Sequence, residues 1–135
     1  MADSIDISVT GDGSANPLLR IEIVNRTVRP LKVYEHSLPW KGWQSLLLIA
    51  AKTDAVGGPL ERELPVDDPG PGVVTIAPGE SLRGEIALAR VFPAIGEARR
   101  ERDVVVFWSY QFKPIDADAL PRAGGWVLFP KTISS

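Results

Sequence analysis

Apolar and polar residues alternate along much of this chain, and that alternation constrains the fold more than any other feature of the sequence. Apolar or small residues occupy every second position over 5–9, 19–23 and 82–88. A period of two is typical of strands that have one face on a core and one face toward solvent. Clusters rich in glycine and proline separate the alternating segments, at 11–14, 57–59, 67–72 and 77–80. These clusters predict tight turns, so the pattern as a whole predicts many short strands joined by turns.

Two further segments are apolar on both faces. The run 44–52 is typical of a strand buried on both sides or of a short core helix, and the turn at 57–59 favours a strand followed by a hairpin partner over 60–64. The segment 103–112 is the strongest strand signal, with Val106 and Trp108 on one side and Phe107 on the other. We expect it to be a central strand with both faces covered. Between 92 and 102 we expect a loop with one helical turn.

With short strands at 31–35, 73–76 and 125–129, the total is about eight or nine strands at sandwich-like spacing. The sequence therefore predicts an all-β fold, a two-sheet antiparallel β-sandwich. A chain of 135 residues is the size of one domain, and 44% hydrophobic and 24% charged residues are ordinary for a globular protein. We expect residues 1–135 to form a single domain.

Three features together resemble immunoglobulin-like sandwich modules. They are a strand that ends in Val24-Asn25-Arg26-Thr27, a Pro78-Gly79-Glu80-Ser81 turn before an alternating strand, and a late aromatic strand. The resemblance covers most of the chain and implies an immunoglobulin-like architecture. The chain lacks the cysteine pair that marks antibody-type members, because it contains no cysteine. The resemblance implies no particular function, because one fold serves many functions.

Composition excludes several classes of function. A net charge of −2 and a pI near 5.4 provide no strong field toward nucleic acid or an anionic membrane. The absence of cysteine removes disulfides, thiolate zinc sites and thiol nucleophiles. The longest apolar stretch, 46–51, is far shorter than the roughly 20 residues that span a bilayer. The acidic start has no apolar run after it, so we expect a cytoplasmic protein, or a periplasmic one if a leader has been removed.

No arrangement of residues predicts catalysis, a cofactor or a metal site. His36 is the only histidine, and no Gly-x-Ser-x-Gly elbow accompanies it. Acidic side chains in turns usually accept hydrogen bonds from nearby backbone N–H groups, so we expect the acidic turns of this chain to be structural and not calcium sites. We likewise expect two strand carboxylates to be ordinary exposed groups and a basic stretch to form a solvated loop. These acidic and basic groups are Asp67-Asp68, Asp116-Ala117-Asp118, the pair Glu61 and Glu63, and Arg99–Arg102.

One stretch of aromatic and polar residues is a candidate binding surface. Trp40 and Trp43 follow Pro39 in a turn-like segment, so they form either a lid on the core or an exposed pair of anchors. Rigid aromatic rings beside polar donors are typical of interface centres. The hypothesis places the partner contact on Tyr34, His36, Trp40, Lys41 and Trp43.

These observations favour a non-enzymatic protein-binding module, with no cofactor, no nucleic acid and no membrane among its partners. Within that class we expect an inhibitor or immunity-type protein that binds a cognate toxin or enzyme. The alternative is a carbohydrate- or peptide-binding domain that uses loop aromatics, and an enzyme ranks third. The oligomeric state stays open at this level.

Overall fold

A computed structural model of the chain describes residues 5–41, 46–54, 58–63 and 72–132. Within these ranges, eight strands lie in three antiparallel sheets, which confirms the all-β class. Two sheets have three strands each, in the orders β1-β2-β6 and β4-β7-β8, and β3 pairs with β5. The strands are β1 (Ile5–Asp12), β2 (Leu18–Asn25), β3 (Leu31–Tyr34), β4 (Leu46–Lys52), β5 (Val73–Ile76), β6 (Ser81–Ala87), β7 (Val104–Tyr110) and β8 (Ala123–Phe129).

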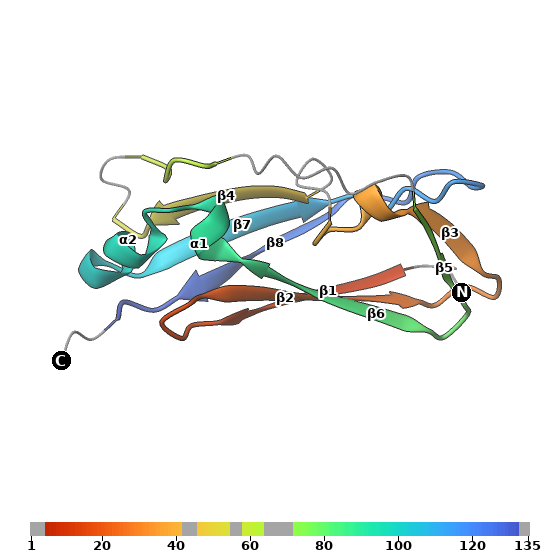
Figure 1. Cartoon of the computed structure of the whole chain (residues 1–135), viewed down its shortest axis with the longest axis horizontal. Helices are drawn as coiled ribbons and strands as arrows, with labels where there is room; N and C mark the ends of the chain where they lie inside the picture. Colours follow the sequence, from red (N-terminus) through yellow and green to blue (C-terminus); the bar gives the residue numbers. More distant parts are fainter. Residues whose placement is uncertain (1–4, 42–45, 55–57, 64–71, 133–135) are drawn as a thin grey trace.

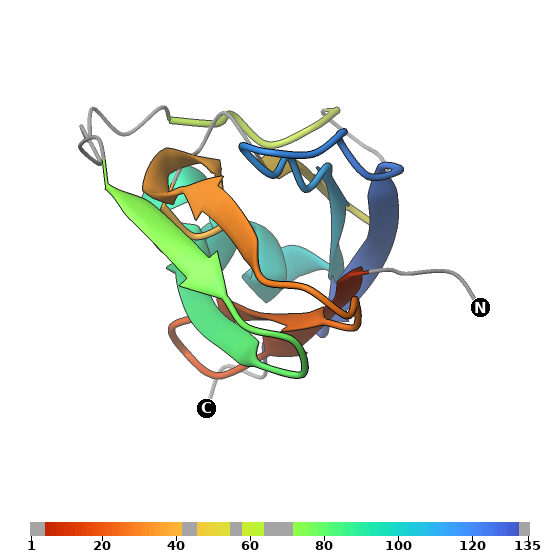
Figure 2. The ribbon, with the colours of Figure 1, turned by 90° about the vertical axis from the view of Figure 1, so that its right-hand side faces the viewer.

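The two three-stranded sheets run along the long axis of the molecule, with the short helices at one end and β3-β5 at the other (Figure 1). Viewed along that axis, the two sheets lie on different sides of one interior (Figure 2). Buried side chains from all three sheets form a single hydrophobic cluster in this interior, among them Leu19, Val33, Leu48, Ile76 and Val106. The described residues therefore share one core.

The alternation in β2 separates core from solvent as expected. Leu19, Ile21 and Ile23 are buried, whereas Arg20 between them is exposed. Strand β2 is the middle strand of its sheet and is antiparallel to both β1 and β6, with Ile21 opposite Gly84 of β6. Because successive side chains of a strand point to opposite faces, this register places the apolar set of the sheet on the core.

Strand β7 is the central strand of its sheet, as predicted, but only one of its faces is covered. Val106 is fully buried on the inner face, which confirms its expected place in the core. On the outer face, Phe107 is 47% exposed, and Ile49 beside it on β4 is 54% exposed. The expectation that both strands are covered on both faces is therefore wrong. An apolar strand sequence indicates which faces could be buried, but not whether another element covers them.

The segment after β6 is more helical than expected. Helix α2 (Ile95–Glu101) lies where the sequence predicted a loop with one turn, and α1 (Leu88–Val91) precedes it, beginning at the residue that was expected to end the alternating strand. Helix α2 buries Ile95, Ala98 and Arg99. The Arg99 guanidinium donates hydrogen bonds to the carbonyl oxygens of Gly13 (2.7 Å), Ser14 (2.9 Å) and Pro130 (3.1 Å). Arg99 therefore connects α2 to the β1–β2 turn and to the segment after β8, and its predicted place in a solvated loop is wrong.

The buried Asn25 links the two motifs that suggested an immunoglobulin-like module. Its side-chain amide donates to the carbonyl oxygens of Ile76 (2.9 Å) and Arg29 (3.0 Å), and its side-chain oxygen accepts from the Thr27 hydroxyl (2.6 Å). Its backbone exchanges hydrogen bonds with Gly79 and Glu80 in the turn before β6. Asn25 thus fastens the end of β2 to the Pro-Gly turn that joins β5 to β6.

The predicted hairpin partner of β4 is reduced to a short contact. Pro59 forms an isolated antiparallel bridge with Ala51, and the Leu60 amide donates to the Ala50 carbonyl oxygen at 2.7 Å. Residues 60–63 form no strand, and residue 64 lies outside the described part of the chain. The edge of β4 is therefore partly protected from pairing by this segment.

Candidate functional site

The outward side of the sheet β4-β7-β8 is an apolar surface built in three rows across the strands. In the middle row, Ile49 pairs with Phe107, and Phe107 pairs with Trp126. The flanking rows follow the same register two residues away on each strand. We call this surface the apolar face; its rows are Leu47-Ser109-Gly124, Ile49-Phe107-Trp126 and Ala51-Val105-Leu128.

Five of the nine positions of the apolar face carry large, exposed side chains. Trp126 is 64% exposed and Leu47 is 50% exposed, in addition to Ile49 and Phe107. None of the nine positions carries a charge. Singly exposed apolar residues are common on proteins, whereas here two aromatic rings and three aliphatic side chains are exposed together on one face.

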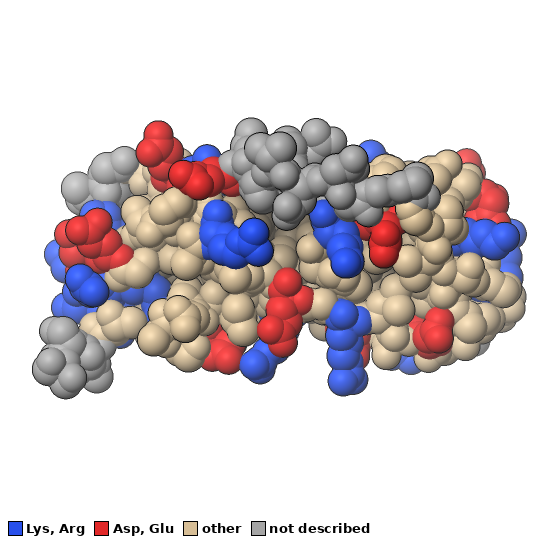
Figure 3. All heavy atoms as spheres, in the orientation of Figure 1, with Lys and Arg blue, Asp and Glu red and all other residues tan. Residues whose placement is uncertain are grey.

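The outward side of the other sheet, β1-β2-β6, provides a comparison within the same molecule. There Arg83 pairs with Glu22 at 2.6 Å, and Arg20 contacts both Asp12 (3.1 Å) and Glu85 (3.6 Å). Cross-strand ion pairs of this kind keep a solvated sheet face polar. Figure 3 shows another side of the molecule, on which β6 and the two helices face the viewer in Figure 1, and basic and acidic side chains are interspersed there. The outer face of β1-β2-β6 is therefore polar, whereas the outer face of β4-β7-β8 is apolar.

Sequence reasoning missed the apolar face because it treated apolar positions on both sides of β4 and β7 as evidence of coverage. A signal was nevertheless present. The segments 46–51 and 104–110 contain no charged residue on either face, and the sequence predicted no long helix that could lie across them. An apolar strand without a candidate cover is itself a reason to expect a binding surface.

The structure separates the predicted partner-binding residues into two places. Tyr34 ends β3 and His36 lies in the 3-10 helix η1 (Glu35–Ser37), where both are exposed. Their rings are stacked, with centroids 5.2 Å apart and planes inclined by 9°. Trp43 lies outside the described residues. Of the predicted contact residues, Tyr34 and His36 thus form an exposed stacked pair. That this pair contacts a partner stays a prediction.

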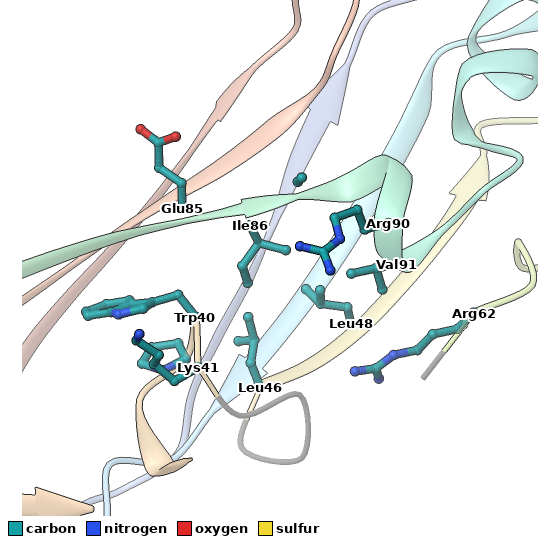
Figure 4. Close-up of a pocket in the computed structure, with 11 residues that line it drawn as sticks. Trp40, Lys41, Leu46, Leu48, Arg62, Glu85, Ile86, Arg90 and Val91 are labelled. Carbon is teal, nitrogen blue, oxygen red and sulfur yellow. The ribbon is translucent and has the colours of Figure 1, made fainter. Parts of the chain in front are cut away.

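Trp40 and Lys41 line a pocket next to β6 (Figure 4). Trp40 is partly buried and packs against the core, with its indole against Gly84. This placement agrees with the interpretation of Trp40 as a lid on the core. The remaining lining is apolar on the floor and charged at the rim: Pro39, Leu46, Leu48, Ile86, Ala87 and Val91, with Arg62, Glu85 and Arg90.

The pocket is small for a ligand site. Its volume is about 130 Å³, below the roughly 300–1,000 Å³ of typical small-molecule pockets. Burial lowers the pKa of the Arg62 guanidinium at the rim. The basic rim could hold a small anion, but the space beneath it does not match a larger molecule.

The acidic groups considered above do not assemble. Asp116 and Asp118 are exposed, as are Glu61 and Glu63, while Asp67 and Asp68 lie outside the described residues. Within the described ranges, no three His, Asp or Glu side chains lie close enough together to hold a metal ion.

No described helix combines the length and the apolar composition needed to cross a membrane. No family model matches the chain, and a search of curated proteins finds no similar one.

Proposed function

We propose that this protein is a non-enzymatic protein-binding module and that the apolar face is its contact surface. The observation that supports the proposal best is the contrast between the two sheets. One outer face carries ion pairs, whereas the other presents Phe107 and Trp126 to solvent without a charged neighbour in its rows. An exposed apolar surface lowers the solubility of a protein, and a role in binding accounts for its presence.

The chemistry of the apolar face suits a protein partner. The cores of protein interfaces are depleted in charge and enriched in aromatic residues, and a few central side chains supply most of the binding energy. Phe107 lies at the centre of the middle row, with Ile49 and Trp126 on either side. These three residues are the expected hot spot. The flanking rows would exclude water around them.

The proposed architecture is an immunoglobulin-like sandwich. Its support is the strand order, because β1-β2-β6 and β4-β7-β8 correspond to the A-B-E and C-F-G orders of that fold. The departure is β3, which pairs with β5 at the end of the molecule instead of extending either sheet. In this correspondence, the C-F-G sheet is the one whose outer side is the apolar face.

An inhibitor or immunity-type role is the form of this proposal that best suits a small acidic domain. Such proteins act by occupying a partner and need no catalytic group. His36, the only histidine, is exposed and stacked on Tyr34. The runner-up, a carbohydrate- or peptide-binding domain, is favoured by the exposed Tyr34–His36 stack, onto which a planar or sugar ring could pack.

Site-specific crosslinking tests the proposed surface. A benzophenone amino acid in place of Trp126 should give a discrete crosslinked protein band, and Ile49→Lys should abolish it. The matched control places the same probe at Ser8, which is exposed on the ion-paired sheet. Equal crosslinking from positions 8 and 126, or no protein crosslink from 126, would contradict the proposal. Titration with glycans, monitored by the fluorescence of a Tyr34→Trp variant, tests the runner-up.

A further inference from the structure

The apolar face has a pattern of side-chain sizes that the contrast with the other sheet does not explain. On the β4 side, its residues are large, large and small, in the order Leu47, Ile49 and Ala51. On the β8 side, Gly124 has no side chain, Trp126 has a very large one and Leu128 has a large one. In the two flanking rows, a bulky residue on one edge is thus matched by a small residue on the other.

We propose that a second copy of this chain packs face to face on the apolar face, about a twofold axis parallel to β7. This inference rests on the proposed function, because it names the occupant of the same surface. An axis in that direction places β4 of one copy over β8 of the other and β7 over β7. Interfaces of this kind are isologous, so every contact is made twice.

The size pattern supports this axis. Leu47 then faces the open position at Gly124, and Ala51 faces Leu128, so that each flanking contact combines a large side chain with a small one. In the middle row, Trp126 covers Ile49 of the second copy. Two sheets that pack face to face interdigitate their side chains across a layer about 10 Å thick, which the flanking rows allow because bulk on one side meets space on the other. In the middle row Phe107 of one copy meets Phe107 of the other at the axis, so the two rings must lie side by side.

The area of the apolar face fits a dimer of modest size. At the usual size of these side chains, the exposed fractions of Leu47, Ile49, Phe107, Trp126 and Leu128 amount to roughly 600 Å² of apolar surface. Stable interfaces bury about 800 Å² on each partner, and homodimer interfaces are more apolar than others. The smaller residues of the three rows and the rim would supply the remainder.

Charged side chains border the apolar face at both of its ends. Arg122 lies at the start of β8 and donates a hydrogen bond to the Ser109 hydroxyl at 2.9 Å. Ser109 is on β7, next to the proposed axis, so the axis brings the two Arg122 guanidinium groups toward each other at this end of the interface. Each exposed Arg122 side chain must turn outward into solvent for the copies to pack. At the α2 end, Lys52 pairs with Glu101 at 2.8 Å and Arg102 pairs with Asp54 at 3.0 Å, so neither pair adds net charge to the rim.

Sedimentation velocity on charge variants tests both the occupant and the axis. We expect the wild type to show a concentration-dependent dimer between about 1 and 100 µM. Ile49→Lys and Trp126→Glu alone should each weaken the dimer by about 100-fold or more, because each buries two unpaired charges per interface. The double variant I49K/W126E should dimerise more strongly than either single variant, because the proposed axis places each new lysine opposite a new glutamate. Ser8→Lys is the matched control and should leave the dimer unchanged.

Each other outcome overturns the inference. A wild type that stays monomeric excludes the second copy, and single variants that leave a dimer intact place the dimer contact elsewhere. A double variant that dimerises no better than the single variants while its circular dichroism melt is unchanged excludes the proposed axis. Crosslinking from position 126 separates these failures from failure of the proposed function. If the probe captures a different protein while the purified chain is monomeric, the binding role stands and only the second copy is wrong.

Discussion

The indole of Trp40 lies against the α-carbon of Gly84, in the space that a β-carbon at this position would occupy. Gly84 is on the inner side of β6 opposite Ile21, so the absence of a side chain there creates the room into which Trp40 packs. A residue before β4 is thereby held against the other three-stranded sheet. The relationship joins the two sides of the core through one aromatic ring.

Gly84→Ala should therefore displace the Trp40 indole and destabilise the protein by about 1–3 kcal/mol, the usual cost of overpacking. Urea denaturation would measure the loss, and the fluorescence emission of the native state should shift to the red as the indole meets water. Gly96→Ala is the control, since nothing lies within 4 Å of a β-carbon at Gly96 in α2. Alanine there should be neutral or stabilise by up to about 1 kcal/mol. Equal effects of the two substitutions would show that Trp40 does not occupy this space.

Asn25→Ala should destabilise the protein by about 3 kcal/mol. The substitution removes two donated and two accepted hydrogen bonds and leaves the buried Ile76 carbonyl oxygen without this donor. Thermal or chemical denaturation would measure the effect. Asn16→Ala, at an exposed position in the β1–β2 turn, should stay within about 0.5 kcal/mol of the wild type. A loss at Asn25 as small as that at Asn16 would mean that the network contributes little.

Arg99→Lys tests whether geometry or charge matters at the end of α2. Lysine keeps the positive charge but cannot reach three carbonyl oxygens with a planar fork, so we expect a loss of about 2 kcal/mol. Hydrogen exchange should also become faster in the β1–β2 turn and after β8, the two segments that Arg99 connects. Arg100→Lys at the adjacent exposed position should change neither quantity. If Arg99→Lys has no effect on either, a charge alone is sufficient at this position.

Burial raises the pKa of the Tyr110 hydroxyl, which donates a hydrogen bond to the Ser37 carbonyl oxygen at 2.6 Å. The unfolded chain ionises this group near pH 10, whereas the fold retains the neutral form. The resulting stabilisation is complete below about pH 10 and decreases by about 1.4 kcal/mol per pH unit above it.

Tyr110→Phe should therefore be less stable than the wild type at pH 7, by about 1 kcal/mol for the lost hydrogen bond. Above about pH 10 the difference should shrink and then reverse, because phenylalanine has no proton to lose. Urea denaturation from pH 7 to about pH 11 would follow this change. Tyr34→Phe, which removes an exposed hydroxyl, should match the wild type at pH 7. Parallel pH profiles for Tyr110→Phe and the wild type would show that the hydroxyl ionises equally in both states.

The strands whose alternation is regular could be predicted from the sequence alone. In β2, the period of two places Leu19, Ile21 and Ile23 on one face, and this assignment needs only the local geometry of an extended chain. The same is true of the turn at Gly79, which adopts a φ of 79° that glycine tolerates. These features depend on neighbouring residues, so the chain itself determined them.

The candidate site could not be predicted in this way, because it depends on what covers a surface. Phe107 and Val106 are adjacent apolar residues in one strand, yet one is exposed and the other is fully buried. Arg99 belongs to a charged stretch, yet it is buried because three distant carbonyl oxygens converge on it. The sequence by itself determined the strands, the turns and the all-β class through local backbone geometry. Only the tertiary structure decided which apolar face lies against the core and which faces solvent, since that outcome depends on contacts between residues far apart in the chain.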